Sequence, residues 1–294
     1  MNERDEMTKS ATQKRYQQQI NSVWQYIQRN LDKRLSLDVL AEVACISPYH
    51  FHRIFTAYTG ESVNQYTKRL RLERAANQLL QSKRKTISDI AIESGYDSLT
   101  AFSKAFRQHY KISPSVYRQH RREALVPYRF DSVSAKENNM QHKIIGRPET
   151  RVLYIRRLGD YMQSAPKAWD AMDAYAEQHQ LISDKTEMIG ICHDSPEITD
   201  KDKIRYDACI PVANNVSPDG EFNIQLLRGG DYAVFLHEGP YETLTETYDR
   251  ISNEWIANQD RELADAPVFE IYLNPELAES NPQGLKTEIY FPLN

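Results

Sequence analysis

The chain has 294 residues, of which 40% are hydrophobic, and this length is typical of about two domains. It contains no apolar run of about eighteen residues, and its polar start lacks the apolar core of a signal peptide, so we exclude membrane-spanning and exported proteins. The three cysteines, Cys45, Cys192 and Cys209, are widely spaced and match no zinc or redox motif. We therefore expect a cytoplasmic protein that uses no metal or other cofactor.

The net charge of −4 is distributed unevenly along the chain. Residues 1–125 contain 21 Lys and Arg against 12 Asp and Glu, a net charge of +9. Residues 126–294 contain 16 against 29, a net charge of −13. The basic part suits a polyanion such as DNA, whereas the acidic part would repel DNA and attract cationic ligands. Because unlike charges also improve solubility, the charge is only a first indication of these partners.

The N-terminal region is polar and charged, and we expect residues 1–15 to form a disordered tail. From Tyr16 onward, apolar residues recur at helical spacing. These residues are Ile20, Val23, Trp24, Ile27 and Leu31. The spacing predicts an amphipathic helix that packs on the next segment, and Ser36 is a suitable cap for the helix that follows.

The segment from Leu37 to Arg122 contains one helical pattern twice, at a spacing of about fifty residues, which is typical of one supersecondary unit used twice. Each copy consists of a short amphipathic helix, a turn and a second helix. Ser47 and Pro48 mark the start of the second helix in the first copy, and Ser98 marks it in the second. Residues expected in the cores are Phe51, Ile54, Phe55, Tyr58, Phe102, Ala105, Phe106 and His109. The pattern predicts an all-α domain with two helix-turn-helix motifs.

The outer face of each second helix is the candidate DNA-binding surface, because a helix of this motif enters the major groove and contacts bases with its early residues. The residues on these faces are Tyr49, His50, His52 and Arg53 in the first copy and Leu99, Thr100, Ser103 and Lys104 in the second. Arginine and lysine can donate to guanine, and threonine or an apolar side chain can contact a thymine methyl. A solvated helix face is the alternative for a single motif, and the duplication disfavours it.

The segment between the copies, 62–83, lacks Gly and Pro and has helical periodicity. About twenty helical residues span roughly 30 Å. Successive major grooves on one side of DNA lie about 34 Å apart, so one chain could place both motifs on DNA as a monomer. Basic side chains that suit phosphate contacts are Lys68, Arg69, Arg71, Arg74, Lys83, Arg84 and Lys85.

The double motif, the run RLRLERAANQLLQSK and the run SGYDSLTAFSKAFRQHYKISPSVYRQHRR resemble the DNA-binding domain of the AraC/XylS family of transcription regulators. The resemblance covers about residues 18–122, and we place this domain at 16–123 and a linker at 124–139. It implies base contacts by Tyr49, His52, Arg53, Leu99, Thr100 and Lys104. Cys45 departs from the family, which usually has glycine in this turn, as the second copy has at Gly95. A Cβ in a left-handed turn conformation costs on the order of 1 kcal/mol.

Residues 140–294 contain a second internal repeat, with an offset close to eighty residues. Gly159-Asp160-Tyr161 corresponds to Gly239-Pro240-Tyr241, and RYDACIPV from Arg205 corresponds to KTEIYFPL from Lys286. Each unit reads strand, helix, strand, strand. We therefore predict an α+β domain with an antiparallel sheet, helices on one face and a ligand cleft between its two halves.

Strand periodicity in this domain singles out Glu270. In the run 268–273, Phe269, Ile271 and Leu273 share one face, which we expect to point toward the helices, so Glu270 and Tyr272 share the opposite face. An exposed glutamate on a solvated sheet face is the first interpretation. If a cleft covers that face, a carboxylate beside aromatic rings suits a cation with a flat apolar body.

The runs YIRRLGDY, KIRYDACIPV, GGDYAVFLHEGPYETL and PVFEIYLNPE resemble the GyrI-like effector-binding domain over about residues 140–294. Domains of this kind bind small molecules, often cationic and hydrophobic. The resemblance implies that Glu270 is the cation partner and that the remaining ligand-binding residues are Tyr272, Tyr206, Tyr241 and Trp169.

We therefore predict a transcription regulator, expected to be an activator, that binds double-stranded promoter DNA as a monomer and acts with RNA polymerase. Its C-terminal domain would bind a small, cationic and hydrophobic effector, and the chain would have no catalytic residue. The alternative is that the C-terminal domain sequesters a toxic compound or hydrolyses a reactive ring, because some GyrI-like domains resemble such hydrolases. In that case Glu270 and Tyr272 would be the acid and base groups.

Overall fold

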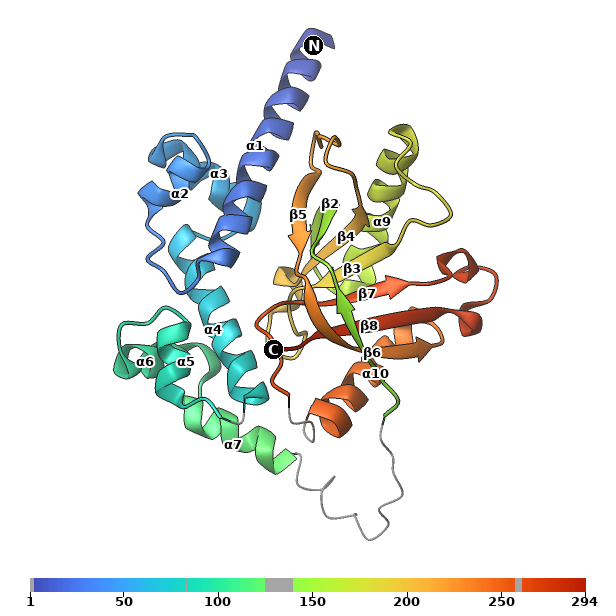
Figure 1. Ribbon diagram of the computed structural model, residues 1–294. Coiled ribbons are helices and arrows are strands. Elements are labelled where there is room, and N and C mark those ends of the chain that lie inside the picture. Colours follow the sequence, from blue (N-terminus) through green and yellow to red (C-terminus); the bar gives the residue numbers. More distant parts are fainter. Residues whose placement is uncertain (1–2, 83, 125–139, 257–260) are drawn as a thin grey trace. The chain divides into compact units, whose positions relative to one another are not determined.

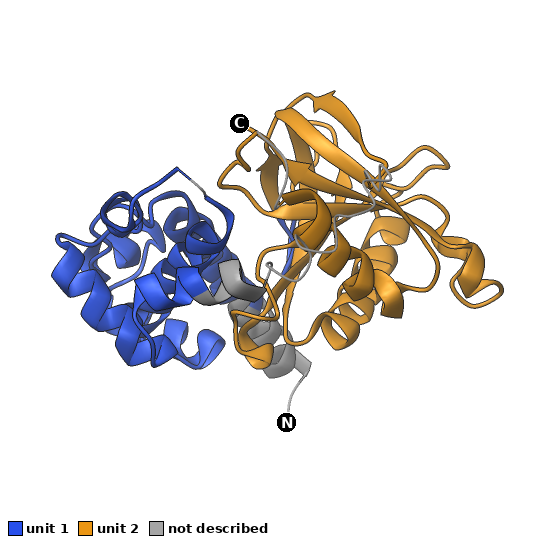
Figure 2. Ribbon diagram, turned by 90° about the horizontal axis from the view of Figure 1, so that it is seen from below, with its two compact units in different colours: residues 1–120, 218–223 blue, residues 121–217, 224–294 orange. Residues whose placement is uncertain are grey.

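The computed structural model describes residues 3–82, 84–124, 140–256 and 261–294 of the chain. It contains two compact units (Figure 2). The first consists of Met1–His120 together with Pro218–Asn223, and the second of Arg121–Ser217 together with Ile224–Asn294. Helices build the first unit and a sheet with helices builds the second (Figure 1). The predicted linker at 124–139 lies, except for Ala124, outside the described residues.

Helices follow one another through the first part of the chain. They are α1 (Glu3–Arg29), α2 (Leu37–Val43), α3 (Pro48–Thr59), α4 (Val63–Gln81), α5 (Ile87–Glu93), α6 (Leu99–Tyr110) and α7 (Pro114–Ala124). Helix α1 begins well before Tyr16, and the disordered tail over residues 1–15 stays a prediction. The segment before Tyr16 contains no Gly or Pro that would end a helix, so the helical backbone extends through it.

Side-chain caps fix the helix starts, and for α3 and α6 they are the serines that the sequence indicated. Ser47 Oγ accepts a hydrogen bond from the backbone N–H of His50 at 3.4 Å, and Ser98 Oγ accepts one from Ala101 at 3.2 Å. Thr86 forms a reciprocal capping box with Asp89 at the start of α5. Each bond satisfies an N–H group that has no partner inside its own helix. The caps therefore set where the second helix of each motif begins.

The two helix-turn-helix motifs have matching cores. Phe51 and Phe55 of α3 are buried with ring centroids 5.4 Å apart, and Phe102 and Phe106 of α6 repeat this pair at 5.4 Å. The repeat continues into the next helix. Tyr66 of α4 lies edge-on to Phe55, and Tyr117 of α7 lies edge-on to Phe106, each at 5.3 Å. Helices α4 and α7 therefore close the two motifs in the same way.

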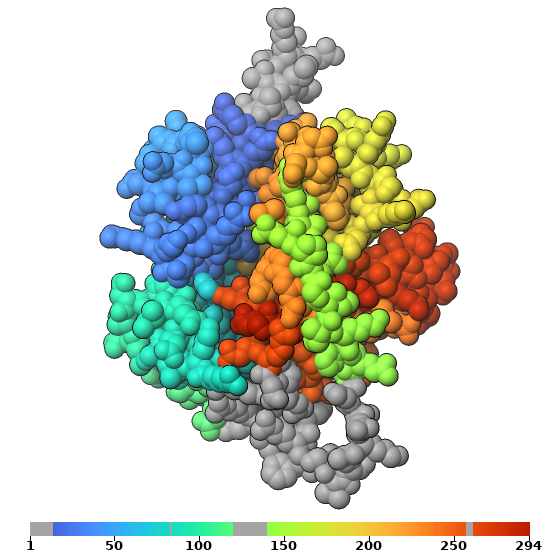
Figure 3. Space-filling model, viewed as in Figure 1, coloured from blue at the N-terminus to red at the C-terminus, as the bar shows by residue number. Residues whose placement is uncertain are grey.

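The second unit is built on one eight-stranded sheet with the order β1-β6-β8-β7-β3-β4-β2-β5 (Figure 1). The strands are β1 (Lys143–Arg147), β2 (Thr150–Leu158), β3 (Met188–Cys192), β4 (Arg205–Pro211), β5 (Asn223–Leu227), β6 (Gly230–Glu238), β7 (Val268–Tyr272) and β8 (Lys286–Pro292). Strand β1 lies at one end of this order and at the surface of the unit (Figure 3).

Two strand-helix-strand-strand repeats supply the six inner strands of this sheet, as predicted, and β1 and β5 lie at its two ends. The first contains β2, helix α9 (Tyr161–Gln178), β3 and β4; the second contains β6, helix α10 (Leu244–Arg250) with the following π-helical turn Ile251–Ile256, β7 and β8. The two repeats meet where β3 and β7 pair antiparallel. In that pairing Gly190 lies opposite Glu270, so Glu270 lies at the junction of the two halves.

The strand alternation in β7 is as predicted. However, the helices pack against the face opposite to the predicted one. Phe269 and Ile271 belong to an apolar cluster that they form with residues of β2, β3, β4, β5, β6 and β8, and Leu273 is 49% exposed. Val268 instead packs against a cluster that includes Ile251 and Trp255 of the helical segment. The prediction that Phe269, Ile271 and Leu273 face the helices is therefore wrong. A curled sheet buries its inner face against its own strands, so an apolar face does not identify the helix side.

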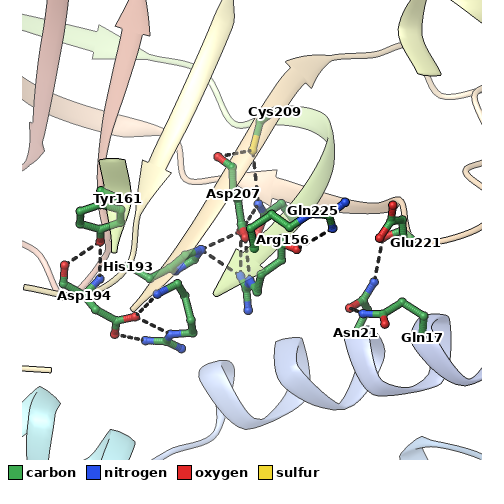
Figure 4. Close-up of polar contacts among 12 residues, drawn as sticks. Gln17, Asn21, Arg156, Tyr161, His193, Asp194, Asp207, Cys209, Glu221 and Gln225 are labelled. Carbon is green, nitrogen blue, oxygen red and sulfur yellow. Dashed lines mark hydrogen bonds and ion pairs between the residues drawn. The ribbon is translucent and has the colours of Figure 1, made fainter. Parts of the chain in front are cut away.

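Two buried ionic clusters bind β2, β3 and β4 together (Figure 4). Arg156 donates to both carboxylate oxygens of Asp207, at 2.6 and 2.7 Å, and His193 lies 2.7 Å from the same group. Arg205 pairs with Asp194 in the same manner. Burial alone would raise the pKa of Asp207, but the Arg156 guanidinium lowers it below its usual range. These clusters fix the strand ends beside the site described next.

Candidate DNA-binding faces and candidate ligand site

The predicted DNA-binding side chains of α3 lie on its solvent-exposed face. Tyr49 is 69% exposed, and His52 and Arg53 are also exposed. The guanidinium carbon of Arg53 lies 5.9 Å from the centre of the Tyr49 ring, which orients the cation at the helix surface. Because Phe51 and Phe55 occupy the opposite face, the core and the candidate DNA face of α3 are separate.

Helix α6 has the same division. Leu99 is 44% exposed, and Thr100 and Lys104 are also exposed, whereas Phe102 and Phe106 are buried. Both helices therefore present early residues on a free face, which is what base reading in a major groove requires. The base contacts themselves stay a prediction.

The basic residues of the connecting segment divide into two groups. Arg84 is exposed after the end of α4, whereas Lys83 lies outside the described residues. Arg69 is buried and pairs with Glu61 at 3.0 Å and with Glu73 at 3.2 Å. Arg71 donates to backbone carbonyls. The prediction of a phosphate contact is therefore wrong for Arg69, which is buried between two carboxylates. For Arg71 it stays a prediction, although two of its donors already bind carbonyl groups of the same chain.

In the second unit, Glu270 is only 4% exposed and accepts hydrogen bonds from three neutral groups. The Tyr272 hydroxyl donates to Oε2 at 2.6 Å, and the Tyr248 hydroxyl donates to Oε1 at 2.8 Å. The Cys192 thiol also donates to Oε1, with the sulfur at 3.8 Å. Glu270 is thus a buried carboxylate, and the first interpretation, an exposed glutamate on a solvated face, is wrong.

A directed chain of hydrogen bonds leads to this carboxylate. The Trp169 indole N–H donates to the Tyr206 hydroxyl at 2.8 Å, and the Tyr206 and Tyr272 hydroxyls lie 2.8 Å apart. The indole nitrogen can only donate, and an ionised carboxylate can only accept. Tyr206 therefore donates to Tyr272, and Tyr272 donates to Glu270.

Aromatic rings surround the Tyr272 end of this chain. The Trp169 ring lies edge-on to the Tyr272 ring at 5.7 Å, and the Tyr241 ring does so at 5.3 Å. The structure thus brings together all five residues predicted to bind ligand. We call this group, together with Tyr248 and Cys192, the Glu270 cluster. Its ligand-binding role stays a prediction.

Burial controls the protonation of the Glu270 cluster. It raises the pKa of Glu270, and the hydrogen bonds from Tyr272 and Tyr248 offset part of that rise. Burial and the nearby Glu270 raise the pKa of Tyr206 and Tyr272 well above the usual value and that of Tyr241 to about 12. At neutral pH the tyrosines therefore stay protonated, so they act as donors and not as anions.

Three further members of the site escaped prediction. Tyr248 and Cys192 donate to Glu270, and Gly190 makes room for the tyrosine hydroxyls. A Cβ on Gly190 would overlap the Tyr206 hydroxyl and lie 2.5 Å from that of Tyr272. Strand alternation in MIGIC places Gly190 and Cys192 on one face. However, only the pairing of β3 with β7 places that face beside Glu270.

Two other properties bear on the possible chemistry. Among the described residues, no group of three or more His, Cys, Asp or Glu is arranged to hold a metal ion. Within the same residues, no helix combines the length and apolar composition needed to cross a bilayer.

Comparison with protein families identifies both units. Residues 40–120 match the family of helix-turn-helix domains, and residues 140–294 match the GyrI-like small molecule binding domain, which is more than half of the chain. The chain is 35% identical over 99 residues to the HTH-type transcriptional activator AarP of Providencia stuartii, covering 34% of this chain and 73% of AarP.

Two relatives come from Salmonella typhimurium. Regulatory protein SoxS is 35% identical over 103 residues, covering 35% of this chain and 95% of SoxS. Transcriptional regulator Rob is 24% identical over 222 residues, covering 73% of this chain and 76% of Rob. All three relatives are regulators. The chain therefore belongs to the AraC family of DNA-binding transcription regulators and carries a GyrI-like small molecule binding domain.

Proposed function

We propose that this regulator activates transcription in response to a small, cationic and hydrophobic molecule that binds at the Glu270 cluster. The observation that carries the proposal is a buried carboxylate whose hydrogen-bond donors, Tyr272, Tyr248 and Cys192, are all neutral. A buried charge is costly until an opposite charge pairs with it. A cation would therefore gain both charge pairing and contact with the faces of the aromatic rings.

DNA binding would use both reading helices of one chain. Helix α4 has 19 residues and therefore a length of about 28 Å, close to the separation of about 34 Å between major grooves on one side of DNA. Arg53 and Lys104 would donate to guanine, and Leu99 and Thr100 would contact thymine methyl groups. Tyr49 and His52 would complete the first base-reading face, and Lys83 and Arg84 would bind phosphates.

The activator role has support from one relative. AarP is named as a transcriptional activator, and the similarity to it extends over 99 residues, 34% of this chain. An activator bound to promoter DNA would act through contact with RNA polymerase. The relatives are regulators, which favours ligand sensing over the hydrolysis of reactive rings as the role of the Glu270 cluster.

The effector proposal is tested by thermal unfolding of the full chain with a panel of aromatic cations and neutral compounds of the same shape. A cation at a hundred times its dissociation constant should stabilise the protein by about 2.7 kcal/mol. Glu270→Gln should abolish this effect, whereas Glu279→Gln at an exposed position should retain it. Equal stabilisation by cations and neutral compounds, or by wild type and Glu270→Gln, would contradict the proposal.

The DNA proposal is tested by selection from a random duplex library followed by mobility-shift titration. Arg53→Ala should cost about 1–3 kcal/mol on the selected duplex and relax the preference at one base pair. Arg84→Ala should weaken binding to all sequences alike, because phosphate contacts carry no sequence information. Failure of the wild type to prefer any sequence at physiological salt would refute it.

A further inference from the structure

Helix α4 is shared by the two helix-turn-helix motifs. Val63, Tyr66 and Leu70, in its first half, belong to the buried cluster of the first motif. The same helix also contacts α5 and α6 of the second motif. The orientation of α6 relative to α3 thus depends on how α4 is held in place. Arg71 directly follows Leu70 in α4.

Arg71 joins α4 to the connection between α1 and α2. Its Nε donates to the Leu31 carbonyl at 2.8 Å, and its Nη2 donates to the Lys33 carbonyl at 2.5 Å. The planar guanidinium can satisfy two acceptors in a fixed direction, which a lysine ammonium cannot reproduce. Arg71 therefore fastens α4 to the first motif by two directed bonds.

The turn of the second motif packs against the same atoms, the Leu31 carbonyl and the Arg71 guanidinium. Gly95 has a φ of +78°, and a Cβ at this position would overlap the Leu31 carbonyl oxygen and lie 2.9 Å from Nε and Cζ of Arg71. The charge of Arg71 also attracts Asp32 of the first connection and Asp97 of the second turn. Three segments, from the α1–α2 connection, from α4 and from the α5–α6 turn, thus meet at one guanidinium.

The corresponding turn of the first motif contains an exposed cysteine. Cys45 has a φ of +55°, and the turn bonds match: Ile46 N–H donates to Ala41 O at 3.1 Å, as Tyr96 N–H donates to Ala91 O at 3.0 Å. Cys45 is exposed, so its side chain has room. The backbone turn therefore tolerates a Cβ, and it is the contact with Leu31 and Arg71 that requires glycine at position 95.

We propose that Arg71 is a positioning residue for DNA recognition, which fixes the orientation of α6 relative to α3 through the Leu31 and Lys33 carbonyls and the Gly95 turn. Arg71 touches no base. It determines whether both reading helices fit one DNA site at the same time. The proposal rests on the use of both motifs by one chain, and its first test needs no DNA.

The test measures the distance between spin labels on α3 and α6 in the full chain by pulsed electron paramagnetic resonance. The labels are attached at Ala57→Cys and Arg107→Cys, both exposed positions, after the native cysteines are replaced by Cys45→Gly, Cys192→Ser and Cys209→Ala. Arg71→Ala should at least double the width of the distance distribution or shift its maximum. Asn64→Ala, at an exposed position of α4, should leave the distribution unchanged.

The second measurement compares two duplexes, one selected by the wild-type protein and one in which the half contacted by α6 is scrambled. Arg71→Ala should lose about tenfold affinity for the intact duplex, equivalent to about 1.4 kcal/mol, and less than twofold for the scrambled one. Arg71→Lys retains the charge without the two directed bonds, so its losses of affinity should resemble those of Arg71→Ala. It also keeps the test valid if Arg71→Ala is unstable. An unchanged distance distribution, or equal losses on both duplexes, would overturn the proposal.

Discussion

The two units of this regulator keep their functional side chains in opposite environments. In the first unit, Tyr49 and Leu99 lie on exposed helix faces, separate from the buried phenylalanines. In the second unit, Glu270 is buried, and its donors Tyr272, Tyr248 and Cys192 are half-buried. Substitutions can therefore separate DNA contact from stability in the first unit, but in the second unit a change at the site also changes stability.

The largest effect on stability is expected for Tyr248→Phe. This change removes one of three donors from the buried carboxylate of Glu270, and a hydrogen bond to a charged group is worth about 1.5–3 kcal/mol. Tyr290→Phe is the matched control, because it removes a donor from the partly exposed Glu288 and should cost about 0.5–1.5 kcal/mol. Denaturant unfolding measures the free energy of unfolding of both variants. Equal losses of stability would contradict the expected difference between the buried Glu270 and the partly exposed Glu288.

Gly190→Ala is expected to destabilise the second unit by about 1–3 kcal/mol, because its Cβ overlaps the hydroxyl groups that lead to Glu270. The matched control is Gly146→Ala in β1, where a Cβ would lie at an ordinary 3.6 Å from Asp231 Oδ1. Denaturant unfolding of both variants tests this difference. A Gly190→Ala protein as stable as Gly146→Ala would show that the hydroxyl chain adapts freely.

Glu270→Gln should show a pH-dependent effect. Burial raises the folded-state pKa of Glu270, so its contribution to stability is present below the ordinary carboxyl pKa and is lost as pH rises through the folded pKa. Relative to wild type, Glu270→Gln should therefore become more stable as pH rises through this window, by at most about 1.4 kcal/mol per pH unit. Unfolding measured from pH 4 to pH 8 checks this, and a difference independent of pH would contradict it.

The smallest stability effects are expected on the candidate DNA faces. Tyr49→Ala and Thr100→Ala remove exposed side chains, so each should change the free energy of unfolding by about 0.5 kcal/mol or less. Both should weaken binding to a selected duplex in mobility-shift titrations. A large loss of stability in either variant would mean that these side chains support the fold, and the contrast between the two units would fail.

Local patterns in the sequence predicted most of the first unit, although His109, which was expected in the core, is exposed. Helical periodicity separates Phe51 and Phe55 from Tyr49 and Arg53, and the Ser47 cap shows where α3 begins. These signals depend on residues within a few turns of one another. The same signals failed for Arg71, whose acceptors are some forty residues away. Arg69 is different, because its partner Glu73 lies at i+4 in the same helix, a spacing that the sequence does show.

The second unit shows the limit of such signals more clearly. Alternation placed Glu270 and Tyr272 on one face, and family resemblance supplied Tyr206, Tyr241 and Trp169. The sequence did not reveal that the helices cover this face, nor that Tyr248 and Gly190 belong to the site. Those facts depend on the curl of the sheet and on the pairing of β3 with β7, which no local period encodes.

The most direct test measures DNA affinity and cation-dependent stability on the same three full-length proteins, the wild type, Arg53→Ala and Glu270→Gln. Our account predicts that each substitution removes one of the two properties and leaves the other. Arg53→Ala should lose affinity for a selected duplex and keep its stabilisation by an aromatic cation, whereas Glu270→Gln, without added cation, should bind the duplex and lose that stabilisation. Stabilisation by the cation that persists in Glu270→Gln, or duplex binding that persists unchanged in Arg53→Ala, would contradict the assignment of these functions to the two sites.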